Sequence, residues 1–259
     1  MDTLEALKIE NAKLKQDLIQ VRKESTQYLQ NVAHQLTAPL GAIKWSIEGL
    51  KTDKPVPLQT RKRLLSSVYS QATILVHLIK NFTLMSNLDA DHELGQFREQ
   101  PEPIDMFKLC INMTNDFQPQ AEDSSKDIKI NHQSFDELFR KRPIKIIKNL
   151  IAQAISNILE NAVKYADKDS VIAIKAVKEK NWIGISIISQ GIPINDSEAS
   201  HIFDRNFRGE AARQRVPAGT GIGLYLVNKI MQIHGGKIQL ALNNKITEFI
   251  LLFPEDSLT

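Results

Sequence analysis

The sequence predicts an α plus α/β protein, in which an antiparallel helical hairpin forms a dimeric four-helix bundle and an α/β sandwich follows. Three observations support this fold class. Apolar residues recur every three or four positions from Leu4 to Phe82, as on one face of a helix. A polar stretch containing Gly95, Pro101 and Pro103 then interrupts the pattern. Beyond it, short β-branched segments alternate with helical ones, which indicates a sheet covered by helices.

The first apolar stripe predicts a coiled coil over residues 1–28. Its members follow alternating steps of three and four residues: Leu4, Leu7, Asn11, Leu14, Leu18, Val21 and Tyr28. Such a stripe is buried only against other helices, and a lone Asn in a core slot often fixes the register of a dimer. A solvated capping segment is the alternative interpretation.

The stripe then shifts by one residue and continues over residues 29–50. His34 is the neighbour of a stripe position, so we expect it at the edge of the packed face, within reach of solvent. Pro39 removes a backbone donor and should bend the helix near His34. A turn at 52–57 leads to a second helix with an apolar face at 65–82. Such a hairpin buries both stripes best as half of a four-helix bundle, so a homodimer is expected.

The polar stretch at 89–103 is interpreted as a linker, with the first domain boundaries at 1–28 and 29–94 and an α/β domain at 95–259. In that domain, strands are expected at 127–132, 171–177, 182–188 and 246–253, and helices at 144–165 and 223–234. Gly235 and Gly236 should end the last helix.

The composition excludes several classes of partner. The net charge is +3, which gives no electrostatic reason to expect nucleic acid or an anionic membrane surface. No apolar run approaches the roughly 18 residues of a membrane span, and the first residues lack the features of a signal peptide. The single cysteine, Cys110, excludes an internal disulfide and fits a reducing, cytoplasmic location. Cys110 lies in an apolar run and is expected in the core.

Asn157, Asn161 and Lys164 are spaced four and three residues apart, so they share one face of the helix expected at 144–165. Two amides and an ammonium group on one face suit a hydrated Mg²⁺ with phosphates, because Mg²⁺ prefers oxygen ligands and keeps several waters. Tyr165 can pack against a base or ribose. A polar helix face in contact with water is the alternative interpretation.

Two glycine-containing segments follow. In the segment 189–194, Gly191 lets a flat ring approach the backbone, although an ordinary turn at a strand end has the same composition. In the segment 219–224, Gly219, Gly221 and Gly223 precede a helix, and their amides can wrap phosphate oxygens. The G-x-G-x-x-G pattern is not met and no βαβ unit surrounds the segment, so a Rossmann site is not expected.

The polar segment 208–218 before these glycines is interpreted as a mobile lid. The candidate phosphate contacts in and before it are Arg205, Arg208, Arg213 and Arg215, of which a solvated position is favoured for the last two. The remaining histidines show no metal-ligand spacing and are expected to be surface or hydrogen-bonded residues: His77, His92, His132, His201 and His234.

In this order, the motifs resemble the dimerisation and catalytic core of sensor histidine kinases over nearly the whole chain. His34 with Pro39 and Leu40 resembles the phosphoacceptor box. Residues 157–165 resemble the asparagine box, 189–194 the first glycine box, 202–208 the phenylalanine box and 219–224 the second glycine box. The resemblance implies a coiled-coil signalling helix, a dimerisation and histidine phosphotransfer hairpin, and a GHKL-type catalytic ATP-binding domain at 95–259.

The resemblance also implies residue roles, with ATP and Mg²⁺ as cofactors. His34 would attack the γ-phosphoryl group, with Gln35 beside it in the catalytic pair, and Asn161 would ligate Mg²⁺. Nucleotide-binding residues would be Asn157, Asn161, Lys164, Tyr165, Ser189, Gly191, Ile194, Arg208, Gly219, Thr220, Gly221, Ile222, Gly223 and Leu224. The implied partners are a second copy of the chain, a response-regulator receiver domain whose aspartate takes the phosphoryl group, and an upstream sensor domain or protein acting through the N-terminal helix.

The chain departs from this family's pattern at three places. Gln35 stands where the family usually has an acidic residue, and an amide cannot act as a base. Ala38 replaces the residue that orients water for phosphatase activity. Ser189 replaces the Asp that accepts a hydrogen bond from the adenine amino group, and Pro193 replaces a glycine of the same box.

Two other functions remain open. The first is a nucleotide-binding scaffold or pseudokinase that signals through conformation, which Gln35 and Ser189 favour. The second is a GHKL ATPase without phosphotransfer, in which Glu160 activates water. Such an ATPase would not need a histidine in a helical hairpin ahead of the ATP-binding domain.

Overall fold

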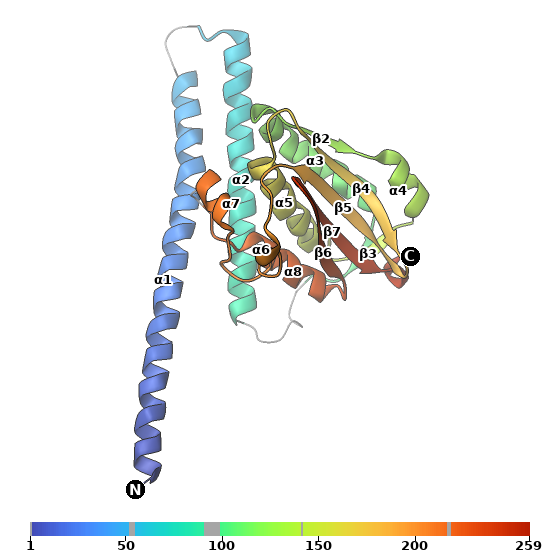
Figure 1. Cartoon of the computed structure of the whole chain (residues 1–259). Helices are drawn as coiled ribbons and strands as arrows, with labels where there is room; N and C mark the ends of the chain where they lie inside the picture. The colour runs from blue at the N-terminus through green and yellow to red at the C-terminus, as the bar shows by residue number, and fades with distance from the viewer. Residues whose placement is uncertain (1, 52–54, 91–98, 141, 217–218) are drawn as a thin grey trace.

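The computed structural model describes residues 2–51, 55–90, 99–140, 142–216 and 219–259. Figure 1 shows a long helical hairpin beside an α/β domain. The expected turn and linker lie partly outside the described residues, as does His92. None of the described helices is long and apolar enough to cross a membrane.

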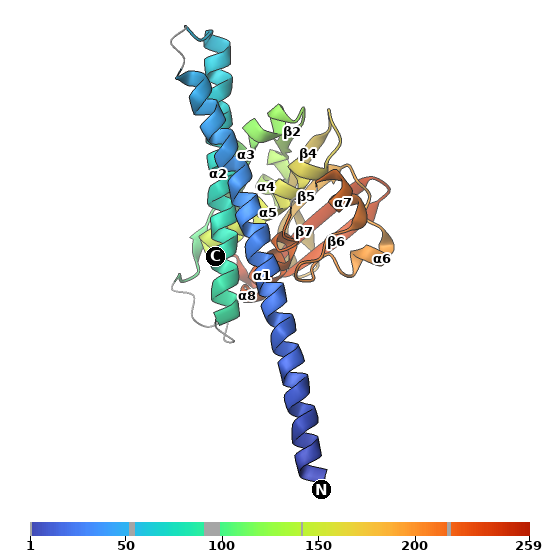
Figure 2. The same ribbon diagram turned by 90° about the vertical axis from the view of Figure 1, so that its left-hand side faces the viewer.

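The hairpin consists of α1 (Asp2–Leu50) and α2 (Leu58–Ala90), as the two apolar stripes predict. The two helices run side by side, and the N-terminal part of α1 extends well past the α/β domain (Figures 1 and 2). The helix is continuous through Pro39. Leu14, Leu18 and Leu29 are exposed on α1, so none of the described helices covers this part of the stripe.

The α/β domain is built on a five-stranded sheet with the order β2-β4-β5-β7-β6. Its strands are β2 (Asp127–Ile130), β4 (Val171–Glu179), β5 (Trp182–Gln190), β6 (Lys237–Asn243) and β7 (Ile246–Pro254). The pair β2–β4 is parallel, and the other pairs are antiparallel. In the central strand β5, buried and exposed residues do not alternate, and most of the strand is buried. Helices cover one face of this strand, and neighbouring strands flank both of its edges.

Three helices lie between the sheet and α2 in Figure 1: α3 (Met106–Asp123), α5 (Lys148–Tyr165) and α8 (Gly223–Ile233). Their apolar faces form one core with the strands, which includes Phe117, Ile158 and Val227. The remaining elements are α4 (His132–Leu138), α6 (Asp196–Ala199), α7 (Glu210–Arg215) and the 3-10 turn η1 (Glu255–Ser257).

The helix expected at 144–165 is wrong at its start. The strand β3 (Ile144–Ile146) pairs with β1 (Glu102–Ile104), and the helix begins only at Lys148. Ile144 and Ile146 are buried whereas Lys145 is exposed, so the burial here has the two-residue period of a strand. β1 lies inside the expected linker, and the lid segment contains α7, neither of which the sequence analysis anticipated.

Two smaller predictions are confirmed. The helix α8 ends at Ile233, where Gly235 adopts a φ of 62° and Gly236 donates a backbone hydrogen bond to Met231 at 2.8 Å. The Cys110 side chain is fully buried, and burial raises the pKa of its thiol. It therefore behaves as a core residue rather than a reactive thiol.

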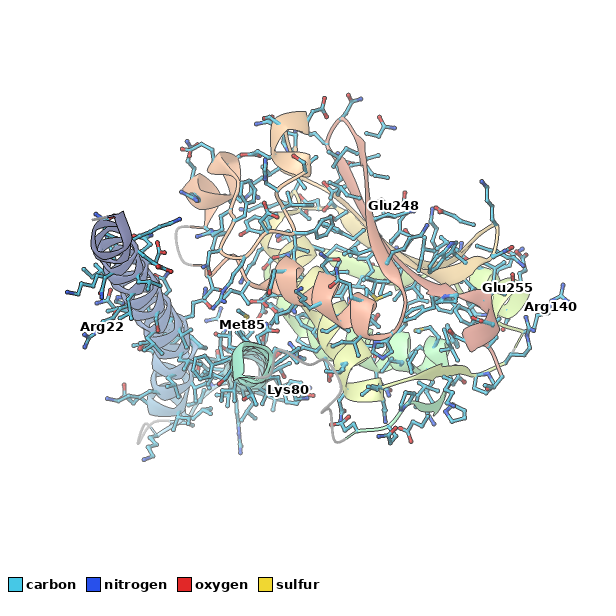
Figure 3. All side chains as sticks on the ribbon, turned by 90° about the horizontal axis from the view of Figure 1, so that it is seen from below. Arg22, Lys80, Met85, Arg140, Glu248 and Glu255 are labelled. Atoms are coloured by element: carbon cyan, nitrogen blue, oxygen red, sulfur yellow. The ribbon has the colours of Figure 1, made fainter. Side chains whose placement is uncertain are left out.

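The helix α2 packs directly on the α/β domain. Viewed from below, α2 lies between α1 and the domain (Figure 3). Met85 of α2 is fully buried and belongs to the same core cluster as α3 and α5. The His77 ring lies 5.2 Å from the Phe117 ring of α3, centroid to centroid. The end of the hairpin is thus part of the domain's core and not a free arm.

His77 is not the hydrogen-bonded or surface residue that the sequence analysis expected. It is buried, and its Nδ1 atom has no hydrogen-bond partner among the described residues. His234 does fit the expectation, because its Nε2 atom accepts from the Ile147 backbone at 3.0 Å and its Nδ1 atom lies 2.7 Å from the Ile230 carbonyl oxygen.

We expect the contact of α2 with the domain to weaken on acidification. Burial lowers the pKa of His77, Lys80 lowers it further, and Glu160 and Asp116 partly oppose this shift. The unfolded chain therefore binds more protons than the folded chain, so stability falls as the pH drops below the ordinary value of about 6.5. Urea unfolding should be measured at about pH 7.5 and about pH 5.5. Between these values the wild type should lose more of its free energy of unfolding than His77→Leu, and His234 is present in both proteins. Equal losses would show that His77 does not titrate in this way.

Candidate active site

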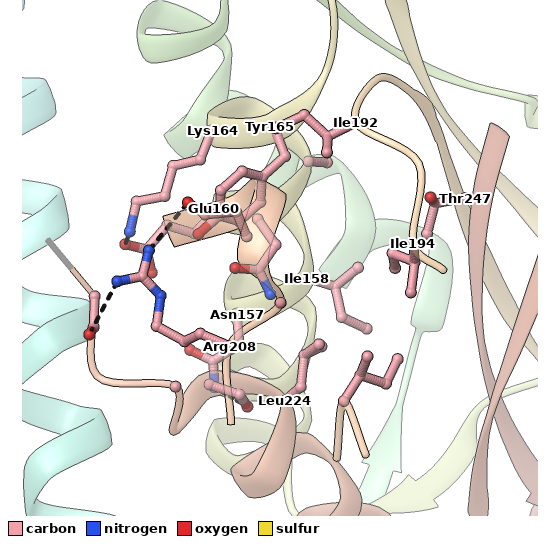
Figure 4. A pocket seen from close by; sticks show the side chains of 18 of the residues that line it. Asn157, Ile158, Glu160, Lys164, Tyr165, Ile192, Ile194, Arg208, Leu224 and Thr247 are labelled. Carbon is pink, nitrogen blue, oxygen red and sulfur yellow. Dashed lines mark hydrogen bonds and ion pairs between the residues drawn. The ribbon is translucent and has the colours of Figure 1, made fainter. Parts of the chain in front are cut away.

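A cavity lies between α5, α8, the segment after β5 and the lid segment with α7 (Figure 4). Its lining includes most of the nucleotide-binding residues expected from the sequence: Asn157, Asn161, Lys164, Tyr165, Ser189, Gly191, Ile194, Arg208, Gly219, Thr220, Gly221, Gly223 and Leu224. Gln35 from α1 also lines it. Segments that are far apart in the sequence thus meet around one cavity.

The polar face of α5 forms one wall of the cavity. The Lys164 ammonium lies 2.6 Å from a Glu160 carboxylate oxygen, in a pair with little exposure to solvent. The Asn161 side chain has no hydrogen-bond partner among the described residues, so its amide oxygen can accept a ligand. The described residues contain no cluster of His, Cys, Asp or Glu that could hold a metal. An amide oxygen beside phosphates fits Mg²⁺, which needs few protein ligands when it keeps its waters.

Asn157 is held differently from Asn161. It is 2% exposed, and its amide forms a reciprocal pair with Asn81 of α2. The Asn81 nitrogen donates to the Asn157 oxygen at 2.6 Å, and the Asn157 nitrogen donates to the Asn81 oxygen at 3.0 Å. Asn157 also donates to the Gly223 carbonyl at 3.3 Å. Its hydrogen-bonding capacity is therefore largely used within the protein.

The end of β5 and the segment after it form the opposite wall. Adding a Cβ atom at Gly191 would place it 2.2 Å from the Tyr165 carbonyl oxygen, so only glycine allows this approach of the segment to α5. Ser189 pairs with Thr247 of β7 in the sheet register, and both line the cavity. The same wall is apolar around them, through Ile187 and Phe249. Apolar side chains with two hydroxyl groups suit a flat, partly polar ring.

The glycine loop borders the cavity where α8 begins. Gly221 has a φ of 70°, and a Cβ atom there would lie 2.6 Å from the Phe207 carbonyl oxygen. The Ile222 side chain is buried in the core and does not line the cavity, so a contact of this residue with a nucleotide would come from its backbone. Its large apolar side chain instead anchors the loop between the two glycines.

Arg208 lines the cavity and also holds the lid segment. Its guanidinium donates to the carbonyl oxygens of Ala212 at 3.2 Å and Gly219 at 3.4 Å, and to that of Val216. The other three candidate arginines, Arg205, Arg213 and Arg215, are not part of the cavity lining. This agrees with the solvated positions favoured for Arg213 and Arg215, and shows that Arg205 does not line the cavity either.

His34 and Gln35 occupy different environments. His34 is exposed on α1, as its position beside the apolar stripe predicts, and it does not line the cavity. With its amide oriented so that the oxygen faces the glycine loop, the Gln35 side chain accepts hydrogen bonds from the backbone nitrogens of Gly219 at 3.2 Å and Thr220 at 2.7 Å. The helix that carries His34 therefore touches the loop that borders the cavity.

Sequence reasoning missed several residues that line the site, among them Asn81, Thr247 and Glu198. Asn81 lies in an ordinary polar position of an amphipathic helix, and Thr247 in an ordinary strand. The Glu198 carboxylate accepts from the Glu210 backbone nitrogen at 2.9 Å at the start of α7. Their roles depend on contacts between distant segments, which spacing along the chain does not reveal.

Comparisons with known proteins agree with this geometry. Residues 147–257 match the family described as histidine kinase-, DNA gyrase B- and HSP90-like ATPase. The histidine protein kinase SaeS of Staphylococcus epidermidis is 30% identical over 215 residues, which are 82% of this chain and 58% of that protein. The histidine kinase AdeS of Acinetobacter baumannii matches 86% of this chain and 98% of its own, with a TM-score of 0.52 and 18% identity.

A further solved structure, histidine kinase ThkA in complex with the response regulator TrrA, matches 99% of this chain and 69% of that chain, with a TM-score of 0.53 and 18% identity. At these identities, the two solved structures show the fold alone. The matched region is an ATP-binding domain of the kinase, gyrase and HSP90 type, and over 82% of its length the chain is similar to a histidine protein kinase. The chain spans less than two thirds of the curated relatives that it matches, 58% in the case of SaeS.

Proposed function

We propose that this chain is an ATP-dependent protein-histidine kinase that phosphorylates His34 and passes the phosphoryl group to an aspartate of a response regulator. One observation carries the proposal. Gln35, the neighbour of His34, lines the cavity that also holds Asn161, Lys164 and the glycine loop. A nucleophile-bearing helix beside a nucleotide site suits transfer from ATP to that helix.

The proposed reaction forms one bond and breaks one. The unprotonated nitrogen of the neutral His34 imidazole forms a bond to the γ-phosphorus, and the bond from that phosphorus to the β-phosphate oxygen breaks, so that ADP leaves with the electron pair. The other ring nitrogen then loses its proton. Because His34 is exposed and the Gln35 amide cannot accept this proton, it passes to solvent.

The protein's part in this reaction is positioning and charge compensation, because phosphoryl transfer has a loose transition state. The backbone of the glycine loop and the Lys164 ammonium would hold the phosphates. Asn161 would ligate Mg²⁺, which supplies compensation of the charge on the phosphate oxygens when it is bound. Tyr165, Ser189 and Thr247 would contact the ribose or the base.

The proposal includes a homodimer in the cytoplasm. The exposed apolar residues of α1 and α2 support dimerisation, because a four-helix bundle would bury them: Leu14, Leu18, Leu29, Leu40, Ile47, Leu65 and Ile79. A coiled coil at residues 1–28 would carry the signal from an upstream sensor domain or partner. The solved complex of ThkA with the response regulator TrrA supports a receiver domain as the phosphoryl acceptor.

Phosphotransfer can be tested with a panel of receiver domains. The chain, labelled by incubation with γ-labelled ATP and Mg²⁺, should pass its label within minutes to one or a few of these domains. A variant receiver with its phosphoacceptor aspartate changed to alanine is the control. If the labelled chain transfers its label to no receiver domain, the proposed transfer to a response regulator is wrong. The proposed phosphorylation of His34 would not be affected by that result.

We expect Gln35→Glu to autophosphorylate faster than the wild type, by roughly tenfold or more, because a carboxylate can take the proton of the imidazole. It can also keep both hydrogen bonds from Gly219 and Thr220, since a carboxylate oxygen accepts them as well as an amide oxygen does. The initial rate of label incorporation measures the effect. Gln16→Glu adds the same charge at an exposed position of α1 that is about five turns from His34, and should change the rate little. An equal or lower rate for Gln35→Glu would contradict this reasoning.

We expect Ser189→Asp to bind ATP at least fivefold more tightly and to discriminate more strongly against GTP, since a charged acceptor adds about 1 kcal/mol. Calorimetric titration of both nucleotides measures this, with Ser200→Asp at an exposed position as the control. If the wild type already binds ATP with micromolar affinity and rejects GTP, Ser189 with Thr247 suffices and the expected gain will be absent.

The alternative proposal is a scaffold that binds nucleotide poorly and signals through conformation. One observation favours it, namely that the amide of Asn157 is occupied by Asn81. A cavity that brings together Asn161, Lys164 and three glycines opposes it, because a protein without a nucleotide has no use for this set. Measured ATP binding without phosphorylation of His34 would support the scaffold.

A further inference from the structure

We infer that the ATP-binding domain phosphorylates His34 of its own chain. Gln35 and Asn81 are the positioning residues that hold this domain to the two hairpin helices of the same chain. The inference rests on the proposed kinase function and answers which subunit of the dimer supplies the histidine. The sequence leaves this question open. Two independent contacts, one from each helix of the hairpin, carry the inference.

The first contact comes from α1. The Gln35 side chain accepts hydrogen bonds from the backbone nitrogens of Gly219 and Thr220, and it lines the cavity of the same chain. His34 precedes it by one residue and is exposed. One residue corresponds to about 100° of rotation and about 1.5 Å of rise along a helix, so His34 starts only a short distance from the loop that would hold the phosphates. Bringing His34 to the phosphates therefore needs only a small movement of the domain along α1. It does not need the domain to bind the partner subunit instead.

The second contact comes from α2. Asn81 and Asn157 exchange two hydrogen bonds, at 2.6 and 3.0 Å, and Gln153 donates a third to the Asn81 oxygen at 2.8 Å. Asn157 and Gln153 are both buried. Pulling α2 away would break three hydrogen bonds between amides that are now shielded from water. The three amides therefore fix α2 to the helix that carries the nucleotide-binding face.

Apolar packing strengthens the second contact. Leu84 and Met85 of α2 belong to the core cluster of the α/β domain, and Met85 is fully buried. The His77 ring packs on Phe117 about two turns earlier along α2. This packing holds the domain beside its own hairpin, where the glycine loop contacts Gln35 of the same chain. Transfer to the partner's histidine would require the glycine loop to leave this α1, whereas transfer within the chain does not.

The test uses mixed dimers in which each subunit lacks one half of the reaction. One chain carries His34→Ala, and the other carries Asn161→Ala with Lys164→Ala. The two chains bear different affinity tags, and successive affinity steps isolate the mixed dimer. Both variant homodimers and the wild-type homodimer are incubated in parallel with γ-labelled ATP and Mg²⁺.

The outcomes separate the inference from the proposed function. Label in the wild type with none in the mixed dimer is the expected result, because no chain then holds both an intact nucleotide site and His34. One labelled histidine per mixed dimer would overturn the inference and leave the kinase proposal intact. Absence of label in the wild type would instead contradict the kinase proposal, and this inference with it.

A second variant tests the positioning role of Asn81. Asn81→Asp keeps the acceptor for Gln153 and Asn157 but removes the donor to the Asn157 oxygen. We expect the labelling rate to fall at least tenfold, with the dissociation constant for ATP unchanged. Asn112→Asp, at an exposed position of α3, is the matched control. An unchanged labelling rate, or a fall in ATP affinity that matches the fall in rate, would overturn this role.

Discussion

Replacing Gly184 by alanine is expected to prevent the ATP-binding domain from folding stably. Gly184 lies in the central strand β5, opposite Leu252 of β7 and Val177 of β4. A Cβ atom there would lie 1.8 Å from the Leu251 carbonyl oxygen and 3.0 Å from the Leu252 Cα atom. Both obstructing atoms belong to the backbone, so the strand must move and its ladder must break. We expect a loss above about 4 kcal/mol, a large part of the stability of a typical domain.

Urea unfolding followed by circular dichroism measures this loss. Gly41→Ala is the matched control, since a Cβ atom at Gly41 meets nothing within 4 Å and the position lies inside α1. This control should gain about 0.5–1 kcal/mol of helix stability. A Gly184→Ala chain that unfolds at the same urea concentration as the wild type would show that β5 and β7 do not approach as closely as described.

The second large effect is expected for Asn161→Ala. Its amide oxygen is the proposed Mg²⁺ ligand on the cavity wall, and no other described group bonds to it. Loss of this ligand should weaken Mg²⁺-dependent ATP binding by roughly tenfold to a hundredfold. Calorimetric titration with and without Mg²⁺ separates the metal contribution from direct contacts of the nucleotide. The variant should bind ATP with nearly the same affinity in both conditions.

Asn149→Ala is the control for that substitution. Asn149 lies on the same helix, but its amide donates to the Glu99 carboxylate at 2.9 Å, at an exposed position outside the cavity. The Asn149→Ala substitution should leave the Mg²⁺-dependent binding of ATP unchanged. If Asn161→Ala kept the full Mg²⁺ dependence, another group would be the metal ligand, and the assignment to Asn161 would be wrong.

Periodicity predicted the elements whose burial has one regular period. The stripes of α1 and α2 and the alternation in β4 follow such a period, and each was found close to its expected range. The segment 144–165 contains a short strand followed by a helix, and the two have different periods. The prediction treated the whole segment as one helix because a single helical pattern fits its apolar residues. β6 and α3 were missed although each carries a regular pattern. Ile238, Leu240 and Leu242 alternate in β6, and the buried residues of α3 recur at helical spacing from Met106 to Ala121.

The site was predictable where it is local. One helix carries Asn157, Asn161 and Lys164, so their spacing alone placed them on one face. The glycines of 219–223 allow the backbone conformation of their loop whatever the rest of the fold does. The pairing of Asn81 with Asn157 joins residues 76 positions apart, and no local pattern encodes it. The sequence motif also did not reveal that the Ile222 side chain packs into the core and anchors the loop from that side.

The proposed function depends above all on His34 accepting phosphate from ATP bound by this chain. The most direct measurement is incubation of the wild type and His34→Ala with γ-labelled ATP and Mg²⁺, followed by treatment with acid. We expect label in the wild type that acid removes, as is typical of a phosphorus–nitrogen bond, and no label in a folded His34→Ala dimer. Equal label in both proteins, or none in a folded wild type that binds ATP, would contradict the proposal.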